Sequence, residues 1–597
     1  MTPVPFKLFA RGEEQYIHIE GEGDGAFDAG DFIEFYAEHN DGWLDASFYP
    51  SADQHTNPYY SLYNDTASYY VTWDPNGAQS VFRYTDVPLT APSGQSLSYV
   101  WQEEVKYYNN TYQKGKDLGG GVPPGTYVGG KGWMSGNFGY NSGSTPTLSP
   151  HDFNTPHPCT QASAPNSTLQ VAVGGVNIGA GGLEAHHLEV GVDNGSGYNV
   201  VDNLLYSSYA YLQTSFQLPA SQIGTTTSVR LRTNSTISPL NTASDYSSCA
   251  FLTLTYPRTL ALDGANAFLF SVPQGAVEVS FAATDFTTIT TTHLYDLGQH
   301  KRVEVNHNTT TGTVQCNLAA GNKRPCYLAA SSAILSLASD DLSEVSFTDP
   351  STLAVSDAYV IVTHSSLMSQ VQSYGTYRAA DQNVVLVDIE TLYDQLSYGI
   401  RKHPIALRNF MEYAIAEWSS PPKFLFIIGK SIEEKTMRKN ANHQRNTLVP
   451  AMGYPVSDVL LTAGLNGEKA YVPAVPTGRL AAKEGEEVTT YLNKVRDFEK
   501  SQSELINPYT IGNRQWQKHI LHFAGGDDAQ ENNRFKNYLS GYQSAIEDSL
   551  FGGKVFLFSK TSGNVIEQLN TDSVRELIKT GPAIMTFSDM LLETALT

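Results

Sequence analysis

The sequence predicts a multidomain protein in which all-β regions, including a β-sandwich, are followed by an α/β domain with a parallel sheet. Three observations favour this fold class. The chain has 597 residues, which is more than a single hydrophobic core supports. Before about residue 350, apolar and polar residues alternate in short runs typical of half-buried strands. After Asp357, continuous apolar runs are separated by amphipathic helical stretches.

We expect four regions along the chain. They are a β-rich N-terminal region at 1–120, a β-sandwich at 121–258, a second β region at 259–350, and the α/β domain at 351–597. In the sandwich region, Leu169–Val173 and Val229–Arg232 show the period of two that strands have when one face is buried.

The α/β region opens with Ala358–Thr363, a run that is apolar on both faces. Val384–Val387 and Phe424–Ile428 repeat this pattern. Between them, Pro404–Trp418 carries an apolar stripe at helical spacing, with proline at a position that favours a helix start. Strands that are apolar on both faces need helices on both sides, so we predict a covered parallel sheet.

The charge of the chain argues against two kinds of partner. Lys and Arg number 38 against 60 Asp and Glu, a formal net charge of −22 that disfavours nucleic acid and anionic membranes. The sequence contains no run of about 18 apolar residues, so it predicts no membrane-spanning helix. Asn-X-Ser/Thr triplets, as at Asn64 and Asn166, are typical of a secreted β-rich surface, although Met1–Phe6 lacks a signal-peptide pattern. We expect an extracellular or cell-surface location.

The chain has four cysteines, and two of them flank a short turn. Cys316 and Cys326 would meet across a β-hairpin and form a disulfide, and two free thiols are the alternative. None of the four lies beside a histidine in a Gly-rich catalytic context.

An acidic segment near the N-terminus has the spacing of a calcium loop. Its acids occupy positions 1, 3, 5, 9 and 12, with glycine at position 6. The predicted ligands of this structural calcium are Glu20, Glu22, Asp24, Asp28 and Asp31. A solvated acidic turn is the alternative.

Six phrases of the α/β region, in order, resemble the gingipain-type cysteine peptidases, in particular the cell-surface members associated with the type IX secretion system of Bacteroidota. The resemblance covers Asp357–Phe587, and the opening segment Gly23–Tyr36 is also similar to the N-terminal region of those proteins. The phrases are Tyr359–His364, Val387–Asp394, Ser397–Arg401, Pro422–Phe424, Tyr454–Asp458 and Val475–Leu480.

The resemblance implies a caspase-like α/β domain in two halves, with a nucleophilic cysteine and a histidine base in the second half. A thiolate needs a neighbouring base, and backbone N–H groups must stabilise the oxyanion. The implied activity is therefore a cysteine-type endopeptidase acting on protein or peptide substrates, without a cofactor for catalysis. Type IX secretion components are the implied partners.

The family histidine follows a strand in a phrase that resembles Phe-Gly-His, and here those positions fall on Ser588, Asp589 and Met590. We therefore expect an α/β domain that is incomplete at its C-terminus, a chain truncated before its Cys/His dyad, and no activity as given. A frameshift is one explanation, because TCG-GAC-ATG with one added T reads TTC-GGA-CAT, which encodes Phe-Gly-His. True divergence in a shortened pseudoenzyme is the alternative.

Several acidic residues are candidates for supporting roles. In the family, an acid in the region of Asp527, Asp528 and Glu531 orients the catalytic histidine, while helix capping is the alternative role. Asp458 lies in a family-like phrase and is a candidate for the substrate cleft, with a structural hydrogen bond as the alternative. His364 follows a buried strand, and a structural role is favoured for it.

The sequence thus supports three hypotheses of function. The first is a secreted or surface gingipain-like endopeptidase. The second is a non-catalytic surface binding protein on a peptidase scaffold, and the third is a sortase-like surface transpeptidase of the type IX secretion system.

Overall fold

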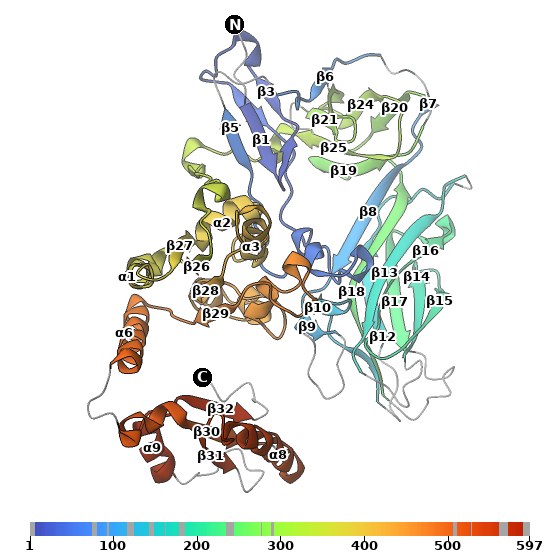
Figure 1. Cartoon of the computed structure of the whole chain (residues 1–597). Helices are drawn as coiled ribbons and strands as arrows, with labels where there is room; N and C mark the ends of the chain where they lie inside the picture. Colours follow the sequence, from blue (N-terminus) through green and yellow to red (C-terminus); the bar gives the residue numbers. More distant parts are fainter. Residues whose placement is uncertain are drawn as a thin grey trace. The chain divides into compact units, whose positions relative to one another are not determined.

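The computed structural model divides the chain into two compact units, Met1–Thr490 and Tyr491–Thr597. Figure 1 shows the β-rich part of the first unit in blue to green and the elements of the α/β region in yellow to red. The structure describes residues 6–73, 80–91, 93, 95–115, 125–141, 148–161, 163–177, 186–233, 244–275, 277–287, 292–504, 510–526, 528–559 and 571–588.

The N-terminal region consists of short antiparallel strands joined by turns, as its alternation of apolar runs and breaks predicts. β1 pairs with β2 and β5, and β3 pairs with β4. Leu8, Ile17 and Ile19 form a small buried cluster among them. The strands are β1 (Phe6–Ala10), β2 (Glu13–Gln15), β3 (His18–Glu20), β4 (Phe32–Glu34) and β5 (Tyr70–Trp73).

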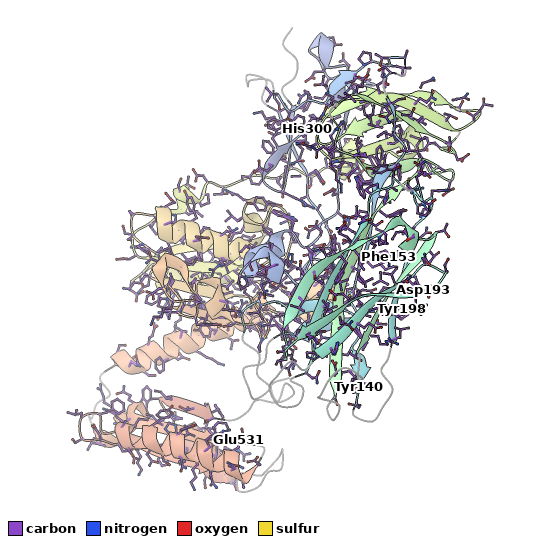
Figure 2. The ribbon with its side chains drawn as sticks, turned by 90° about the vertical axis from the view of Figure 1, so that its right-hand side faces the viewer. Tyr140, Phe153, Asp193, Tyr198, His300 and Glu531 are labelled. Carbon is purple, nitrogen blue, oxygen red and sulfur yellow. The ribbon has the colours of Figure 1, made fainter. Side chains whose placement is uncertain are left out.

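The predicted β-sandwich is present. Its first sheet has the order β12-β17-β14-β15, and its second sheet includes the order β16-β13-β18-β8. Side chains of both sheets share one buried core, which includes Leu169 and Val229. Figure 2 shows Asp193 and Tyr198, register partners on β14 and β15, lying side by side. The strands are β8 (Val100–Tyr107), β12 (Leu148–Asn154), β13 (Ser167–Gly175), β14 (His186–Asp193), β15 (Tyr198–Tyr206), β16 (Tyr211–Leu218), β17 (Thr226–Thr233) and β18 (Asp245–Arg258).

Strand β8 joins the sandwich to the second β region. It pairs with β18 along its length and reaches β19 at Trp101. Because β8 belongs to the sandwich sheet, the predicted division between 1–120 and 121–258 separates one strand from its partners. The region boundaries stay predictions.

In the second β region, β19, β25, β21 and β22 continue the long sheet, and β23-β24-β20 with β7 form a separate one. Phe270, Phe281 and Leu328 belong to the buried core that these strands share. The strands are β7 (Gln95–Ser96), β19 (Ala267–Val272), β20 (Val279–Ala283), β21 (Thr292–Asp296), β22 (Lys301–Glu304), β23 (Asn306–Asn308), β24 (Thr313–Leu318) and β25 (Arg324–Ala330).

The predicted hairpin around Cys316 and Cys326 was wrong. Cys316 lies on β24, which pairs with β20 and β23, whereas Cys326 lies on β25, which pairs with β19 and β21. The two strands belong to different sheets, so the local turn does not bring the cysteines together as neighbouring strand residues. Both thiols are free and buried in this structure, and the disulfide between them stays a prediction.

The α/β part of the first unit is a parallel sheet with the order β27-β26-β28-β29, which confirms the predicted fold class. Proline at position 404 is the N-cap residue of α3, as its place in the sequence predicts. The elements are β26 (Ala358–Thr363), α1 (Met368–Arg378), β27 (Asn383–Asp388), α2 (Ile389–Leu396), α3 (Ile405–Glu417), β28 (Phe424–Ile428), α4 (Glu434–Arg438), α5 (Ala441–Asn446) and β29 (Thr477–Leu480).

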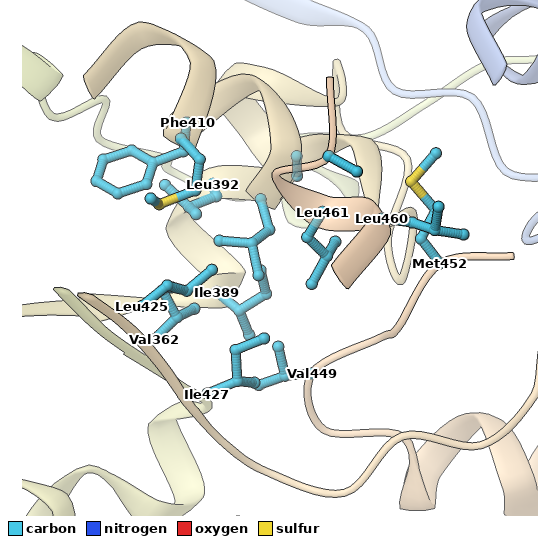
Figure 3. Close-up of a cluster of buried hydrophobic side chains, with 14 of the residues drawn as sticks. Val362, Ile389, Leu392, Phe410, Leu425, Ile427, Val449, Met452, Leu460 and Leu461 are labelled. Atoms are coloured by element: carbon cyan, nitrogen blue, oxygen red, sulfur yellow. The ribbon is translucent and has the colours of Figure 1, made fainter. Parts of the chain in front are cut away.

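Helices α2 and α3 bury their apolar stripes against this sheet. Figure 3 shows Val362, Leu425 and Ile427 of the strands beside Leu392 and Phe410 of the helices. The same buried cluster also contains aromatic residues from the N-terminal part, including those on the two-stranded ribbon of β9 (Thr111–Lys114) and β10 (Lys131–Met134). The N-terminal part therefore shares a hydrophobic core with the α/β sheet within this unit.

The second unit contains a three-stranded parallel sheet with β30 between β31 and β32. In this sheet β32 is an edge strand, and its Ile584 and Phe587 are 54% and 69% exposed. Its elements are β30 (His519–Ala524), α8 (Ala529–Ile546), β31 (Lys554–Ser559), α9 (Thr571–Lys579) and β32 (Ile584–Ser588), and α6 (Gly485–Ser503) spans the division between the units.

Among the helices that the structure describes, none is long and apolar enough to cross a membrane.

Candidate functional site

The carboxyl ends of the parallel strands in the first unit form the candidate site. Strand β27, which follows β26 in the chain, pairs with one edge of β26. The next strand, β28, pairs with the opposite edge of β26. Such a switch point opens a crevice outside the carboxyl ends of the strands, where ligands of open α/β sheets bind. His364 follows β26, Glu390 follows β27, and Gly429 follows β28.

His364 and Glu390 are held in a network of charges at this edge. The Nε2 atom of His364 lies 3.4 Å from Oε1 of Glu390, and its Nδ1 accepts a hydrogen bond from the backbone N–H of Ser366. Lys402 and Arg401 also form ion pairs with Glu390. Since both ring nitrogens of His364 have partners, its contacts agree with the structural role that the sequence favours.

Burial alone would raise the pKa of Glu390. The hydrogen bonds from His364 and Lys402 and the charges of Lys402 and Arg401 outweigh burial, and they lower the pKa to about 2. Glu390 is therefore a carboxylate at neutral pH. A pocket of about 430 Å³ beside this network is lined by Tyr63, Asn64, His364, Arg401, Lys402, Ala441, Gln444 and Arg445.

Asp458 forms a two-pronged ion pair with Arg479, with distances of 2.8 and 2.7 Å. Arg479 lies on β29 and also donates to the backbone carbonyls of Gly429 and Val449. A Cβ at Gly429, whose φ is +152°, would lie 2.9 Å from Val449, so this close approach favours glycine. These contacts support the structural alternative for Asp458, and its place in a substrate cleft stays a prediction.

A buried carboxyl that the sequence analysis missed lies just after β28. Glu434 is 1% exposed and accepts hydrogen bonds from the hydroxyls of Tyr63 at 3.2 Å, Tyr127 at 2.8 Å and Tyr112. We call these four residues the Glu434 cluster. Burial raises the pKa of Glu434 to about 7, although the three hydroxyls lower it in part. No sequence signal marks this cluster, because the tyrosines lie 307 to 371 residues away.

The candidate acids of the second unit take different roles. Asp528 is the N-cap residue of α8, and its side chain accepts a 2.7 Å hydrogen bond from the backbone N–H of Glu531. Glu531, labelled in Figure 2, forms an ion pair with Arg534 at 3.0 Å. These contacts support the capping alternative for Asp528. Asp527 lies outside the described residues, as do Asp589 and Met590, where the family histidine phrase was expected.

The predicted calcium ligands do not gather around one point. Glu22 forms an ion pair with Arg83 at 2.8 Å, and Asp31 accepts a hydrogen bond from the backbone N–H of Asp28 at 2.6 Å. In the part of the chain that the structure describes, no group of three or more His, Cys, Asp or Glu side chains is placed to hold a metal ion. Calcium binding by this loop therefore stays a prediction.

All four cysteines are buried in the β-rich regions. Burial raises the pKa of the thiols of Cys249, Cys316 and Cys326, so that their thiolate forms are disfavoured. A reactive cysteine needs the opposite environment, with an accessible sulfur and a lowered pKa.

Comparison with known proteins gives the family of the α/β region. Residues 354–589 match the model of peptidase family C25. Over these residues the chain is similar to peptidase family C25. The match confirms the gingipain-type resemblance over the segment in which the six phrases lie, and it contains no cysteine. No curated protein matches the chain.

Solved structures show weaker similarity. The chain is similar to dimeric latent PorU from Porphyromonas gingivalis, with 13% identity, a TM-score of 0.49, and coverage of 88% of this chain and 50% of that one. This chain thus spans about half the length of the PorU structure. A β-galacturonidase of glycoside hydrolase family GH2 from Eisenbergiella tayi, bound to galacturonate, has 9% identity and a TM-score of 0.15, with coverage of 76% and 88%. A Bifidobacterium dentium β-glucuronidase has the same identity and TM-score, with coverage of 85% and 92%. Similarities at these scores carry no argument about activity.

Proposed function

We propose that this chain supplies the scaffold of a gingipain-type cysteine endopeptidase that cleaves protein or peptide substrates with a Cys/His dyad. The observation that carries the proposal is the match of residues 354–589 to peptidase family C25. The parallel sheet with a switch point agrees with it, because that edge is where substrates of such sheets bind.

The nucleophile of this reaction is none of the four cysteines of the chain. Each of them is buried, and all of them precede the family segment. A dyad needs a thiol within hydrogen-bond reach of an imidazole, together with backbone N–H groups directed at the oxyanion. We therefore expect no peptide hydrolysis by the 597-residue chain itself.

Location and partners form a further part of this proposal. An acidic surface and repeated Asn-X-Ser/Thr triplets support an extracellular or cell-surface protein. We propose type IX secretion components as partners, on the strength of the family phrases and the opening segment Gly23–Tyr36. We also propose a structural calcium ion in the acidic N-terminal loop. For Glu22 to bind calcium, its ion pair with Arg83 would have to break.

A non-catalytic binding protein is the second candidate, and one observation favours it. The family segment contains no cysteine, so the scaffold carries no thiol at its own carboxyl edge. In that case the sheet edge and its pocket would hold a peptide without cleaving it.

Two preparations distinguish these candidates. The purified 597-residue chain and the protein isolated from its native source are each incubated with a fluorogenic protein substrate and a biotinylated epoxysuccinyl thiol probe. We expect neither hydrolysis nor labelling of the chain, and both for the native protein. A native protein that binds the substrate but is neither active nor labelled would refute the peptidase proposal and support the binding protein.

A further inference from the structure

A second pocket of about 520 Å³ lies in the first unit, between the ribbon of β9 and β10 and helix α4. Its volume falls in the range of about 300–1,000 Å³ that is common for ligand pockets. No carboxylate lines it, although the chain has a net charge of −22. We call it the Trp133 pocket, and its lining residues are Asn109, Asn110, Thr111, Tyr112, Trp133, Lys435, Thr436 and Lys439.

Two ammonium groups border this pocket. Lys435 and Lys439 are four residues apart, in α4 and at its C-cap, so their side chains lie on the same side of the helix. Neither forms an ion pair with a carboxylate among the described residues. Lys435 donates only a long 3.4 Å hydrogen bond to the hydroxyl of Tyr454, and burial lowers the pKa of Lys439.

Two aromatic residues, Trp133 and Tyr112, line the pocket. The Nζ atom of Lys439 lies 4.6 Å from the centre of the Trp133 ring, and Trp133 packs edge to face against Tyr112. The indole N–H of Trp133 is buried, and within the described structure it has no hydrogen-bond partner.

The lining is thus rich in donors and positively charged, and it includes two aromatic rings. Two ammonium groups and two side-chain amides offer hydrogen bonds to a carboxylate. The faces of Tyr112 and Trp133 offer apolar contact to the methylene groups beside that carboxylate. Phosphate groups are often bound by the two parallel N–H groups of an arginine guanidinium. No arginine lines this pocket, so its lining favours a carboxylate over a phosphate.

We propose that the Trp133 pocket binds the side-chain carboxylates of an acidic peptide segment. The choice of a peptide rests on the proposed function, in which the ligands of this scaffold are proteins or peptides. The pocket is lined only by residues of β9, β10, α4 and their flanking positions, so it is a separate site from the carboxyl edge that contains His364 and Glu390.

Fluorescence anisotropy with a fluorescein-labelled triglutamate peptide tests the proposal on the purified 597-residue chain. A triglutamine peptide is the control ligand. We expect the triglutamate peptide to bind and the triglutamine peptide to bind at least about tenfold more weakly, because hydrogen bonds to charged groups are stronger than those between neutral groups.

Substitutions locate the binding. The substitutions Lys435→Gln and Lys439→Gln should each weaken binding of the triglutamate peptide about tenfold. Lys423→Gln is the matched control, because Lys423 also lies over an aromatic ring, that of Phe424 at 5.7 Å, but outside the pocket. Circular dichroism and urea unfolding verify that each variant is folded.

Four results would overturn the proposal. They are no binding of triglutamate, equal binding of both peptides, equal affinities of the Lys423 and Lys439 variants, and competition by inorganic phosphate as strong as that by unlabelled triglutamate. The last result would identify a general anion site. Because this assay measures equilibrium binding without thiol chemistry, its failure is distinguishable from failure of the peptidase proposal.

Discussion

Replacing Glu434 by glutamine should remove a loss of folding stability that develops as the pH rises. This loss arises where the N-terminal part contacts the α/β sheet. Glu434 lies on α4 and accepts hydrogen bonds from the hydroxyls of Tyr63, Tyr112 and Tyr127. Burial raises the pKa of all three tyrosines, so they remain donors throughout the neutral range. The carboxyl group is therefore the member of the Glu434 cluster that changes charge.

The magnitude follows from the pKa of Glu434, which rises from 4.5 to about 7 on folding. Each pKa unit corresponds to 1.36 kcal/mol, so the shift is worth about 3 kcal/mol. Because the folded protein holds this proton more tightly than the unfolded chain, the contribution is fully present below pH 4.5. It is lost as the pH rises, and the loss is complete above about pH 7. The neighbouring Glu433 raises the pKa further, while the hydroxyls oppose the shift.

Urea unfolding at pH 5 and pH 8, followed by tryptophan fluorescence, measures the effect. Trp133 packs against Tyr112 of the cluster, so a Trp133→Phe variant identifies which fluorescence transition reports on this contact. Between the two pH values, the stability difference between Glu434→Gln and the unmodified chain should shift by about 2.5 kcal/mol in favour of the variant.

Glu412→Gln is the control for this experiment, because Glu412 is an exposed carboxylate of α3. It should leave the pH dependence unchanged. The reasoning would be refuted if Glu434→Gln and Glu412→Gln showed the same pH dependence, or if the unmodified chain became more stable from pH 5 to pH 8 in this transition.

Two further predictions concern the sheets. Asp458→Asn should lower the free energy of unfolding by about 2 kcal/mol, since Arg479 is only 11% exposed and would lose its counter-charge, and an unchanged urea midpoint would contradict this. Phe587→Thr on the edge strand β32 should raise the temperature at which light scattering begins, because an exposed apolar edge promotes association. Phe523→Thr, in the central strand β30, is the contrasting control and should lower that temperature.

The parallel sheet was predictable because its strands are recognisable one by one. Ala358–Thr363 and Phe424–Ile428 are apolar on both faces, and only a covered sheet buries such strands. The sandwich strands were equally visible, because residues 226–233 alternate between buried and exposed positions. In these cases the local pattern and the tertiary structure follow the same period.

Other features depend on pairing over long sequence separation, which no local pattern shows. Cys316 and Cys326 flank a short turn, yet their strands pair with other strands. Glu22 occupies a calcium-like position, but Arg83, 61 residues away, takes its carboxylate. The Glu434 cluster and the Trp133 pocket each bring residues on or near β9 and β10 into contact with α4. No local sequence pattern predicts the contact between these segments.

We propose that residues 354–589 form a cysteine peptidase scaffold whose nucleophile is none of the four cysteines in this chain. Mass spectrometry of the native-source protein, after inactivation by the epoxysuccinyl probe under native conditions, tests this proposal. We predict that peptide hydrolysis is lost while Cys159, Cys249, Cys316 and Cys326 all remain unmodified. Loss of hydrolysis together with stoichiometric modification of any one of these four cysteines would contradict the proposal.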